Sequence, residues 1–275
     1  MIWRQQRLLA ALLSFLLLAA CASPQQRGAA DEVLPVTGAN ASSTAGYSVS
    51  SDTQRRADAH LQLALAYYQQ AQWQVALDEV ARALRASPRE PDALSMRGLI
   101  YMASGRQDLA GADFLEALRI VPEQPDYLNN YAWFLCRSGR AQESLSWFDR
   151  AVKRPDSRSP EKALNNAGTC SIAAGDRRAA KAYFLRAAAV QSGNVRSHAE
   201  LAKLYFDDGD YPRARFHAER ATAVTTPGVD ALWLAIKVAR KSDQPSTEAK
   251  LLAQLSHLYP DSAEYAAYQR GAFDE

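Results

Sequence analysis

Three cysteines and four histidines are the residues of this 275-residue chain whose chemistry could be functional. Thiolates and imidazoles can bind metal ions, act as nucleophiles or transfer protons. The sequence has no HExxH segment, no glycine-rich phosphate loop and no cysteine, histidine and aspartate close together. We therefore expect no enzyme, no metal site, no cofactor and no small-molecule substrate. We expect structural roles for the four histidines, which are His60, His198, His217 and His257.

The first cysteine, Cys21, directly follows an N-terminal apolar segment. The first seven residues include two arginines, and the apolar run of residues 8–18 is too short to span a bilayer comfortably. The sequence Leu18-Ala19-Ala20-Cys21 resembles the lipobox of bacterial lipoproteins, in which the signal is removed before an acylated cysteine. This predicts a signal peptide at residues 1–20 and a lipid anchor of several acyl chains on Cys21. An ordinary signal peptide with an incidental cysteine is the alternative.

The chain after the predicted cleavage site carries 30 basic and 30 acidic residues, since the signal removes two arginines and no acids. A nucleic-acid partner requires a basic face, so we expect none. Ala22 and not aspartate follows the cysteine, which by the sorting rule of enteric lipoproteins implies the outer membrane, facing the periplasm. Residues 21–56 are rich in small and polar residues and predict a lipidated N-terminus with a flexible tether, roughly 30 Å long as a coil. Packing of residues 33–36 on the first repeat is the alternative.

Residues 91–122 contain the pattern that organises the rest of the chain. Small residues at Gly98 and Ala110 alternate with the aromatic residues Tyr101 and Phe114, and Pro122 closes the segment. This is the spacing of a tetratricopeptide unit, in which two antiparallel helices cross at the small residues. Arg97 is the one departure from the pattern. A single such hairpin cannot bury its apolar face, so neighbouring copies must stack on it.

The same register recurs along the chain at 34-residue spacing, with two extra residues between the third and fourth copies. The copies begin near residues 57, 91, 125, 161, 195 and 229, and together cover residues 57–262. Residues 263–275 complete the chain as a capping helix and tail. The sequence predicts an all-α fold, a right-handed superhelical solenoid of six tetratricopeptide hairpins with a short C-terminal capping helix. A helical bundle with chance spacing is the alternative.

The two later cysteines, Cys136 and Cys170, occupy similar positions on the first helices of the third and fourth repeats. These helices lie side by side in a solenoid, and an even pair of cysteines in the periplasm favours oxidation. A disulfide would close a loop of about 35 residues and stabilise the fold by on the order of 4 kcal/mol. Two buried free thiols are the alternative. No histidine stands at a metal-ligand spacing from either cysteine.

A tetratricopeptide solenoid binds partners in the concave groove that its first helices line. By position, this groove is apolar at its N-terminal end and basic at its C-terminal end, where Lys237, Arg240 and Lys241 lie near Trp233. Exposed apolar residues in a groove indicate a partner site, for example for a helix or strand. Packing of these residues on one another or on the tether is the alternative. The candidate partner-binding residues are Leu61, Leu65, Tyr68, Leu99, Met102, Asn129 and Trp133.

The lipobox, the polar tether and the six repeats together resemble the type IV pilus biogenesis and stability lipoproteins, the PilF/PilW pilotin family. Residues 128–136, LNNYAWFLC, resemble that family's N-N-Y-G-x-F-L-C stretch, and residues 164–170, LNNAGTC, resemble its N-x-G-x-C stretch. Ala132 stands where the family often has glycine. The resemblance covers the whole chain after the signal.

The resemblance implies a pilotin that binds the type IV pilus secretin, holds it at the outer membrane and promotes its assembly into a ring. The lipid anchor would supply the location and the groove the recognition. A periplasmic adaptor for another envelope machine, serving outer-membrane protein insertion or cell-wall synthesis, is the second hypothesis. A lipoprotein hydrolase would need a nucleophile constellation that the sequence does not contain.

Overall fold

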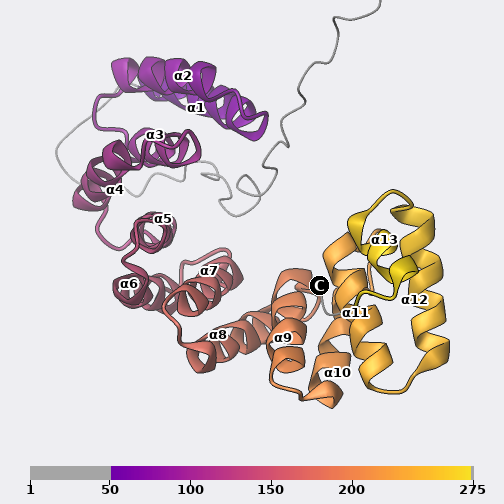
Figure 1. Cartoon of the computed structure of the whole chain (residues 1–275). Coiled ribbons are helices and arrows are strands. Elements are labelled where there is room, and N and C mark those ends of the chain that lie inside the picture. Colours follow the sequence, from indigo (N-terminus) through magenta and orange to yellow (C-terminus); the bar gives the residue numbers. More distant parts are fainter. Residues whose placement is uncertain (1–50, 274–275) are drawn as a thin grey trace, which may run out of the picture.

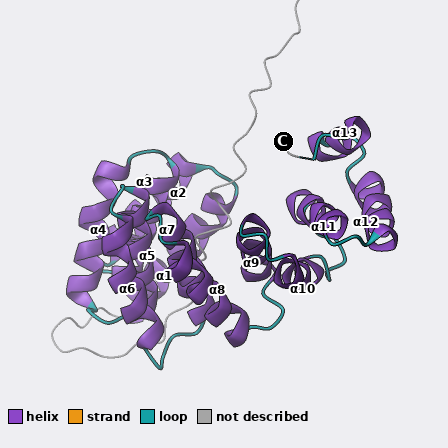
Figure 2. Cartoon of the chain, turned by 60° about the horizontal axis from the view of Figure 1, so that its bottom comes forward, coloured by secondary structure: helices purple, strands orange, loops and turns teal. Residues whose placement is uncertain are grey.

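The computed structural model describes residues 51–273, which form thirteen α-helices. Consecutive helices pair as antiparallel hairpins, and each hairpin packs on the next (Figure 1). Helices follow one another along the whole described segment, joined by short loops (Figure 2). The all-α solenoid predicted from the repeat spacing is confirmed.

The helices have the following bounds. The first helices of the six hairpins are α1 (Ser51–Gln69), α3 (Pro91–Ala103), α5 (Pro125–Arg137), α7 (Pro160–Ala173), α9 (Val195–Asp207) and α11 (Val229–Lys241). The second helices are α2 (Trp73–Ala86), α4 (Gln107–Ile120), α6 (Ala141–Lys153), α8 (Arg177–Val190), α10 (Tyr211–Ala221) and α12 (Pro245–Leu258). The last helix is α13 (Ala263–Arg270).

Each hairpin turns at one residue in the left-handed backbone conformation. In the four central hairpins this residue is glycine, with φ between 75° at Gly209 and 81° at Gly139. The first and last hairpins use Ala71 and Asp243 at φ 56° and 53°, where a side chain is disfavoured. The terminal repeats therefore keep the turn geometry without glycine, the residue that adopts it most easily.

Fully buried phenylalanines fill the crossing between the two helices of the second, third and fourth hairpins. These are Phe114, Phe148 and Phe184. In two of the three hairpins the ring lies against a glycine of the first helix, Gly98 or Gly168, where a Cβ would approach ring atoms to 2.7 and 2.6 Å. The close approach of the helices thus depends on the absence of a side chain at these glycines.

Arg97, the departure from the repeat pattern, forms an ion pair inside the second hairpin. Its Nε and Nη2 atoms donate to the two carboxylate oxygens of Asp113 at 2.8 and 2.6 Å. Asp113 is buried on α4, so its charge requires such a partner. Arg97 therefore joins the two helices by a bidentate ion pair, at a position where the repeat pattern has an apolar residue.

Helix α1 begins at Ser51, inside the segment predicted as tether at residues 21–56. That boundary is wrong by six residues, because polar pairs one turn apart stabilise the additional turn. Arg55 donates to Asp52 at 3.2 Å, and Gln54 donates both to Asp58 and to Glu90 of the next hairpin. The remaining tether, the predicted signal peptide at residues 1–20 and Cys21 lie outside the described residues.

Candidate partner-binding groove

The first helices of the six hairpins line the inner side of the arc, and the second helices form its outer side (Figure 1). Successive first helices contact each other directly along this face, as α1 does with α3 and α5 with α7. Among residues 51–273, no helix is both long and apolar enough to cross a membrane. The same described segment holds no cluster of three or more His, Cys, Asp or Glu side chains suited to a metal ion.

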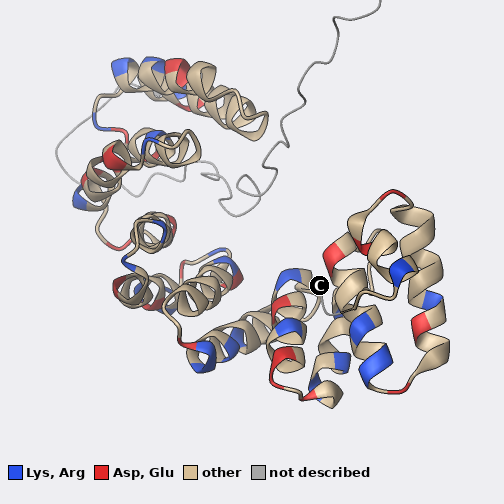
Figure 3. Cartoon of the chain, in the orientation of Figure 1, with Lys and Arg blue, Asp and Glu red and all other residues tan. Residues whose placement is uncertain are grey.

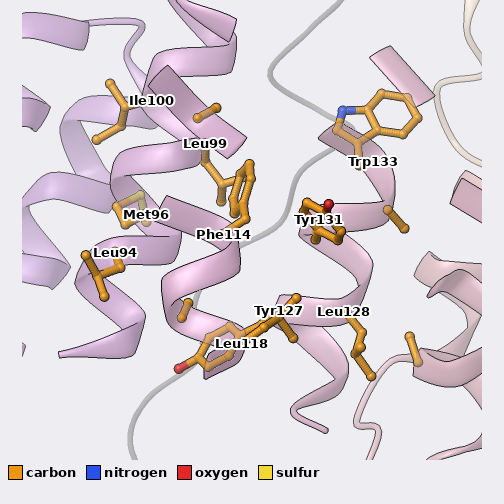
Figure 4. Packing of buried hydrophobic residues seen from close by; sticks show 14 of the residues in the cluster. Leu94, Met96, Leu99, Ile100, Phe114, Leu118, Tyr127, Leu128, Tyr131 and Trp133 are labelled. Atoms are coloured by element: carbon orange, nitrogen blue, oxygen red, sulfur yellow. The ribbon is translucent and has the colours of Figure 1, made fainter. Parts of the chain in front are cut away.

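Four of the seven candidate groove residues are buried, so the expectation of exposed side chains there is wrong. Leu61, Tyr68, Leu99 and Trp133 are between 2% and 8% exposed and belong to the apolar core. Figure 4 shows Leu99 and Trp133 among the members of this core cluster. Tyr68 packs on the ring of Trp73, with 5.3 Å between centroids. Packing between neighbouring helices, which the sequence left open as the alternative, accounts for these four.

The other three candidate residues, Leu65, Met102 and Asn129, remain half-exposed on α1, α3 and α5. Leu65 and Met102 pack against the core from its surface, so they are accessible apolar positions on the inner face. Asn129 accepts a hydrogen bond from Asn166 and donates one to Asn130. Leu65 and Met102 are therefore the candidates with most free surface for a partner.

Acidic side chains lie at the N-terminal end of the groove, which the sequence predicted to be apolar. Asp92 accepts a hydrogen bond of 2.5 Å from the hydroxyl of Tyr127 on the next first helix. Burial, together with the nearby charges of Glu90, Asp126 and Asp58, raises the pKa of Asp92 from 3.8 to about 6, although the hydrogen bond from Tyr127 opposes this. The N-terminal end of the groove is therefore acidic where its side chains meet solvent.

Replacing Asp92 by asparagine is expected to stabilise the chain at pH 7.5 and to have little effect near pH 4. Because the folded pKa is raised, folding favours the protonated carboxyl, and this contribution is lost as pH rises from about 4 to 6. Asparagine avoids a charge at this partly buried position and still accepts the hydrogen bond from Tyr127. The gain at pH 7.5 should be about 1–2 kcal/mol after allowance for solvent screening.

Thermal unfolding at both pH values measures this difference. The matched control is Asp78→Asn at an exposed position on α2, which should change the melting temperature little at either pH. An Asp92→Asn variant that is less stable than the parent chain at pH 7.5 would contradict the burial argument.

The third and fourth repeats are joined covalently across the inner face. Cys136 on α5 and Cys170 on α7 form a disulfide, with 2.09 Å between the sulfur atoms and 5.8 Å between the Cα atoms. Both cysteines are buried. The bond fixes the C-terminal halves of these two helices to each other at the middle of the solenoid.

A chain of amide hydrogen bonds links the same two helices nearer their N-terminal ends. Asn166 of α7 donates to Asn129 of α5 at 3.1 Å, and Asn129 donates to its neighbour Asn130 at 3.2 Å. Asn130 in turn donates to the hydroxyl of Ser95 on α3 at 3.0 Å. Since these groups are largely buried, each needs the next as a partner. The α5–α7 contact is therefore stabilised at two positions along the helices, by the amides nearer their N-terminal ends and by the disulfide in their C-terminal halves.

A second set of buried polar groups connects α7 to α9. Ser197 donates through its hydroxyl to the Oδ1 atom of Asn165 at 2.7 Å, and Asn165 donates to Asn194 at 3.2 Å. Asn194 also caps α9 by accepting from the backbone N–H of Ser197 at 2.9 Å. Sequence reasoning missed Asn194 and Ser197. For Asn194, the N-cap residue type just before the helical register was an available signal.

Three of the four histidines, His60, His198 and His217, take part in contacts between the helices of single repeats, whereas His257 is exposed. In the fifth hairpin, the Nδ1 atoms of His198 and His217 lie 2.9 Å apart, and His198 Nε2 donates to the carbonyl of Ser192. Burial, with the neighbouring charges of His198 and Arg220, lowers the pKa of His217 to about 4, so it is neutral at physiological pH. In the first hairpin, His60 lies 2.7 Å from Glu79.

Comparison with known proteins identifies the relatives of this repeat array. A tetratricopeptide repeat family model matches residues 61–125 and 172–230. The solved structure of PilW, a widely conserved type IV pilus biogenesis factor, is 30% identical, with a TM-score of 0.68, over 78% of this chain and 98% of PilW. The chain belongs to this family of type IV pilus biogenesis proteins.

Two further comparisons involve PilF of Pseudomonas aeruginosa. The type IV pilus assembly protein PilF is 27% identical over 214 residues, covering 77% of this chain and 84% of PilF. A solved structure of Pseudomonas aeruginosa PilF, 24% identical, shares the fold with a TM-score of 0.69 over 80% of this chain and 99% of that chain. The described residues are thus a tetratricopeptide scaffold of the type IV pilus system, and such scaffolds bind proteins.

The asparagine and cysteine motifs that carry the sequence resemblance to the PilF/PilW family occupy one region of the structure. They supply the amide chain and the disulfide between α5 and α7, together with the amide contact to α9. These motifs therefore brace the middle of the groove. They leave little free polar surface for a partner, since the amides bind one another.

Proposed function

We propose that this chain is an outer-membrane pilotin for type IV pilus biogenesis. In this proposal Cys21 carries the lipid anchor, and the chain faces the periplasm. The groove binds the pilus secretin and promotes its localisation to the outer membrane and its multimerisation.

Family membership is the observation that carries this proposal, because the match to PilW extends over nearly the whole of that pilus biogenesis factor. The groove adds a physical argument. Its middle is braced by a disulfide and buried amides, and a pre-organised surface loses less conformational entropy on binding. The accessible apolar residues Leu65 and Met102 offer contacts to an apolar segment of a partner.

The location of the secretin in a deletion strain tests the proposed function. Fractionated membranes should contain secretin monomers in the inner membrane, and heat- and detergent-resistant multimers should be lost. A Cys21→Ala variant should fail to restore outer-membrane multimers. Normal multimers in the deletion strain, accompanied by general envelope defects, would remove the pilotin role and favour an adaptor for another envelope machine.

A groove variant separates recognition from anchoring. Leu65→Glu places a charge at a half-exposed apolar position of the inner face and is expected to reduce secretin multimers at least about tenfold. The matched control is Leu63→Glu on the same helix, because Leu63 is already 47% exposed and lies outside the groove positions. Circular dichroism should show both variants folded. Equal multimer levels in the two variants would exclude Leu65 from the recognition surface.

A further inference from the structure

The chain's C-terminal segment returns onto the groove face of the last repeat. Helix α13 ends at Arg270 and is followed by Gly271, whose φ of 72° lies in the left-handed region that glycine tolerates. The backbone N–H of Ala272 then donates to the carbonyl of Ala267 at 2.9 Å, which reverses the chain direction. This turn brings Phe273 back onto α11.

Phe273 is held between an aromatic ring and a guanidinium group of α11. Its ring stacks on Trp233, with 5.4 Å between centroids and 20° between planes. The guanidinium carbon of Arg240 lies 3.8 Å from the centre of the same ring. Trp233 is 8% exposed, although its register places it on the groove side of the last repeat. The chain's own aromatic residue therefore occupies a groove position.

Aromatic and cationic side chains alternate along this end of the groove. The ammonium of Lys237 lies 5.6 Å from the ring of Trp233 and 5.9 Å from the ring of Phe206 on α9. Figure 3 shows the basic residues of α11 and its neighbours. Lys241 adds a further exposed positive charge. Glu248 lies 3.3 Å from Arg240 and offsets part of the positive charge of this surface. A surface of this kind binds an aromatic ring by cation–π contact and attracts carboxylates.

Phe273 packs against the apolar cluster that caps the solenoid and also lies on the groove face. The apolar end of the last hairpin is covered by α13 itself, whose Ala267 is buried in the same cluster as Leu232 and Leu255. Phe273 meets the ring of Tyr268 on α13 edge-on, with 5.6 Å between centroids, and its other contacts, Trp233 and Arg240, stand at groove positions of α11. Two acidic residues, Asp274 and Glu275, follow it in the sequence. The tail sequence thus combines an aromatic residue with acidic residues, and these are the groups that the aromatic and cationic groove surface would bind.

We propose that this end of the groove is a docking subsite for an extended protein segment that carries an aromatic side chain next to carboxylates. The chain's own Phe273 occupies the subsite until such a segment displaces it. The inference rests on the contacts within α9, α11 and the tail, and it depends on neither the lipid anchor nor the secretin.

Peptide binding to the purified chain from residue 22 onward tests the subsite. The probe is a fluorescently labelled Gly-Ala-Phe-Asp-Glu peptide, followed by anisotropy. A chain ending at Ala272 keeps the hydrogen bond that closes α13 but lacks Phe273, and it is expected to bind at least about tenfold more tightly than the full chain. The full-length Phe273→Ala variant should show the same gain, so the test does not depend on the truncation folding.

Further variants separate a docking subsite from a structural cap. Adding Arg240→Ala to the Phe273→Ala chain should remove the gain, whereas Lys250→Ala at an exposed position of α12 should leave it unchanged. A Gly-Ala-Ala-Asp-Glu peptide should not bind. Equal affinities of the full chain and the folded Phe273→Ala chain would overturn the proposal and leave Phe273 as a cap. A full-length dimer that disappears on truncation would assign the subsite to a second copy and also overturn it.

Discussion

Replacing Cys136 and Cys170 by alanine is expected to lower the free energy of unfolding of the central repeats by on the order of 4 kcal/mol. The disulfide joins residues 34 apart in sequence, so it removes the loop-closure entropy of the third and fourth repeats from the unfolded state. Alanine avoids placing two hydroxyl groups at buried positions. Guanidinium unfolding of the oxidised chain and of the double variant measures the difference.

Reduction supplies the control for this prediction. Dithiothreitol should lower the stability of the parent chain by a similar amount and leave the double alanine variant unchanged. Since a solenoid can unfold repeat by repeat, hydrogen exchange should locate the loss of protection in α5 to α8. A double variant within about 1 kcal/mol of the oxidised chain would show that the α5–α7 contact is maintained mainly by its amides and apolar packing.

The second large effect is expected at Gly168, where valine should cost about 3 kcal/mol or more. A Cβ at this position would lie 2.6 Å from two ring atoms of Phe184, a distance that real Cβ atoms essentially never show. The Phe184 ring is fully buried, so it cannot move aside without disturbing the helix crossing. Denaturant unfolding should show the loss, and hydrogen exchange should assign it to α7 and α8.

Gly193 provides the matched control for this substitution. It lies in the loop between α8 and α9, where an added Cβ would meet no atom within 4 Å, and its φ does not require glycine. Gly193→Val should therefore change the stability by no more than about 0.5 kcal/mol. Similar losses at the two glycines would mean that backbone conformation and not the Phe184 contact determines the effect.

The sequence by itself determined the architecture of this protein, because a solenoid is built from local contacts that repeat. Small residues such as Gly98 and Ala110, and the turn glycines such as Gly105, recur at one spacing because each hairpin faces the same packing problem. First helices α3, α5, α7, α9 and α11 begin at Pro91, Pro125, Pro160, Val195 and Val229. The sequence did not predict the start of α1, because hydrogen bonds between polar side chains within one helical turn leave no pattern that recurs from repeat to repeat.

The tertiary structure alone decided which groove positions are accessible. Position in the repeat places Leu61, Tyr68, Leu99 and Trp133 on the inner face, but their exposure depends on the side chains that neighbouring helices supply. These neighbours bury all four. The partners of Arg97 and of the asparagines likewise lie on other helices, so the sequence pattern does not identify them.

The electrostatic character of the two groove ends was also decided by the fold. The sequence predicted a basic C-terminal end, and the lysines and Arg240 of α11 lie there, but Phe273 of the returning tail lies among them. At the opposite end, Asp58, Glu90 and Asp126 lie near the partly buried Asp92, so this end of the groove carries several carboxylates as well as apolar residues. Both outcomes depend on distances between residues of different repeats or of the tail, which periodicity within a single repeat does not determine.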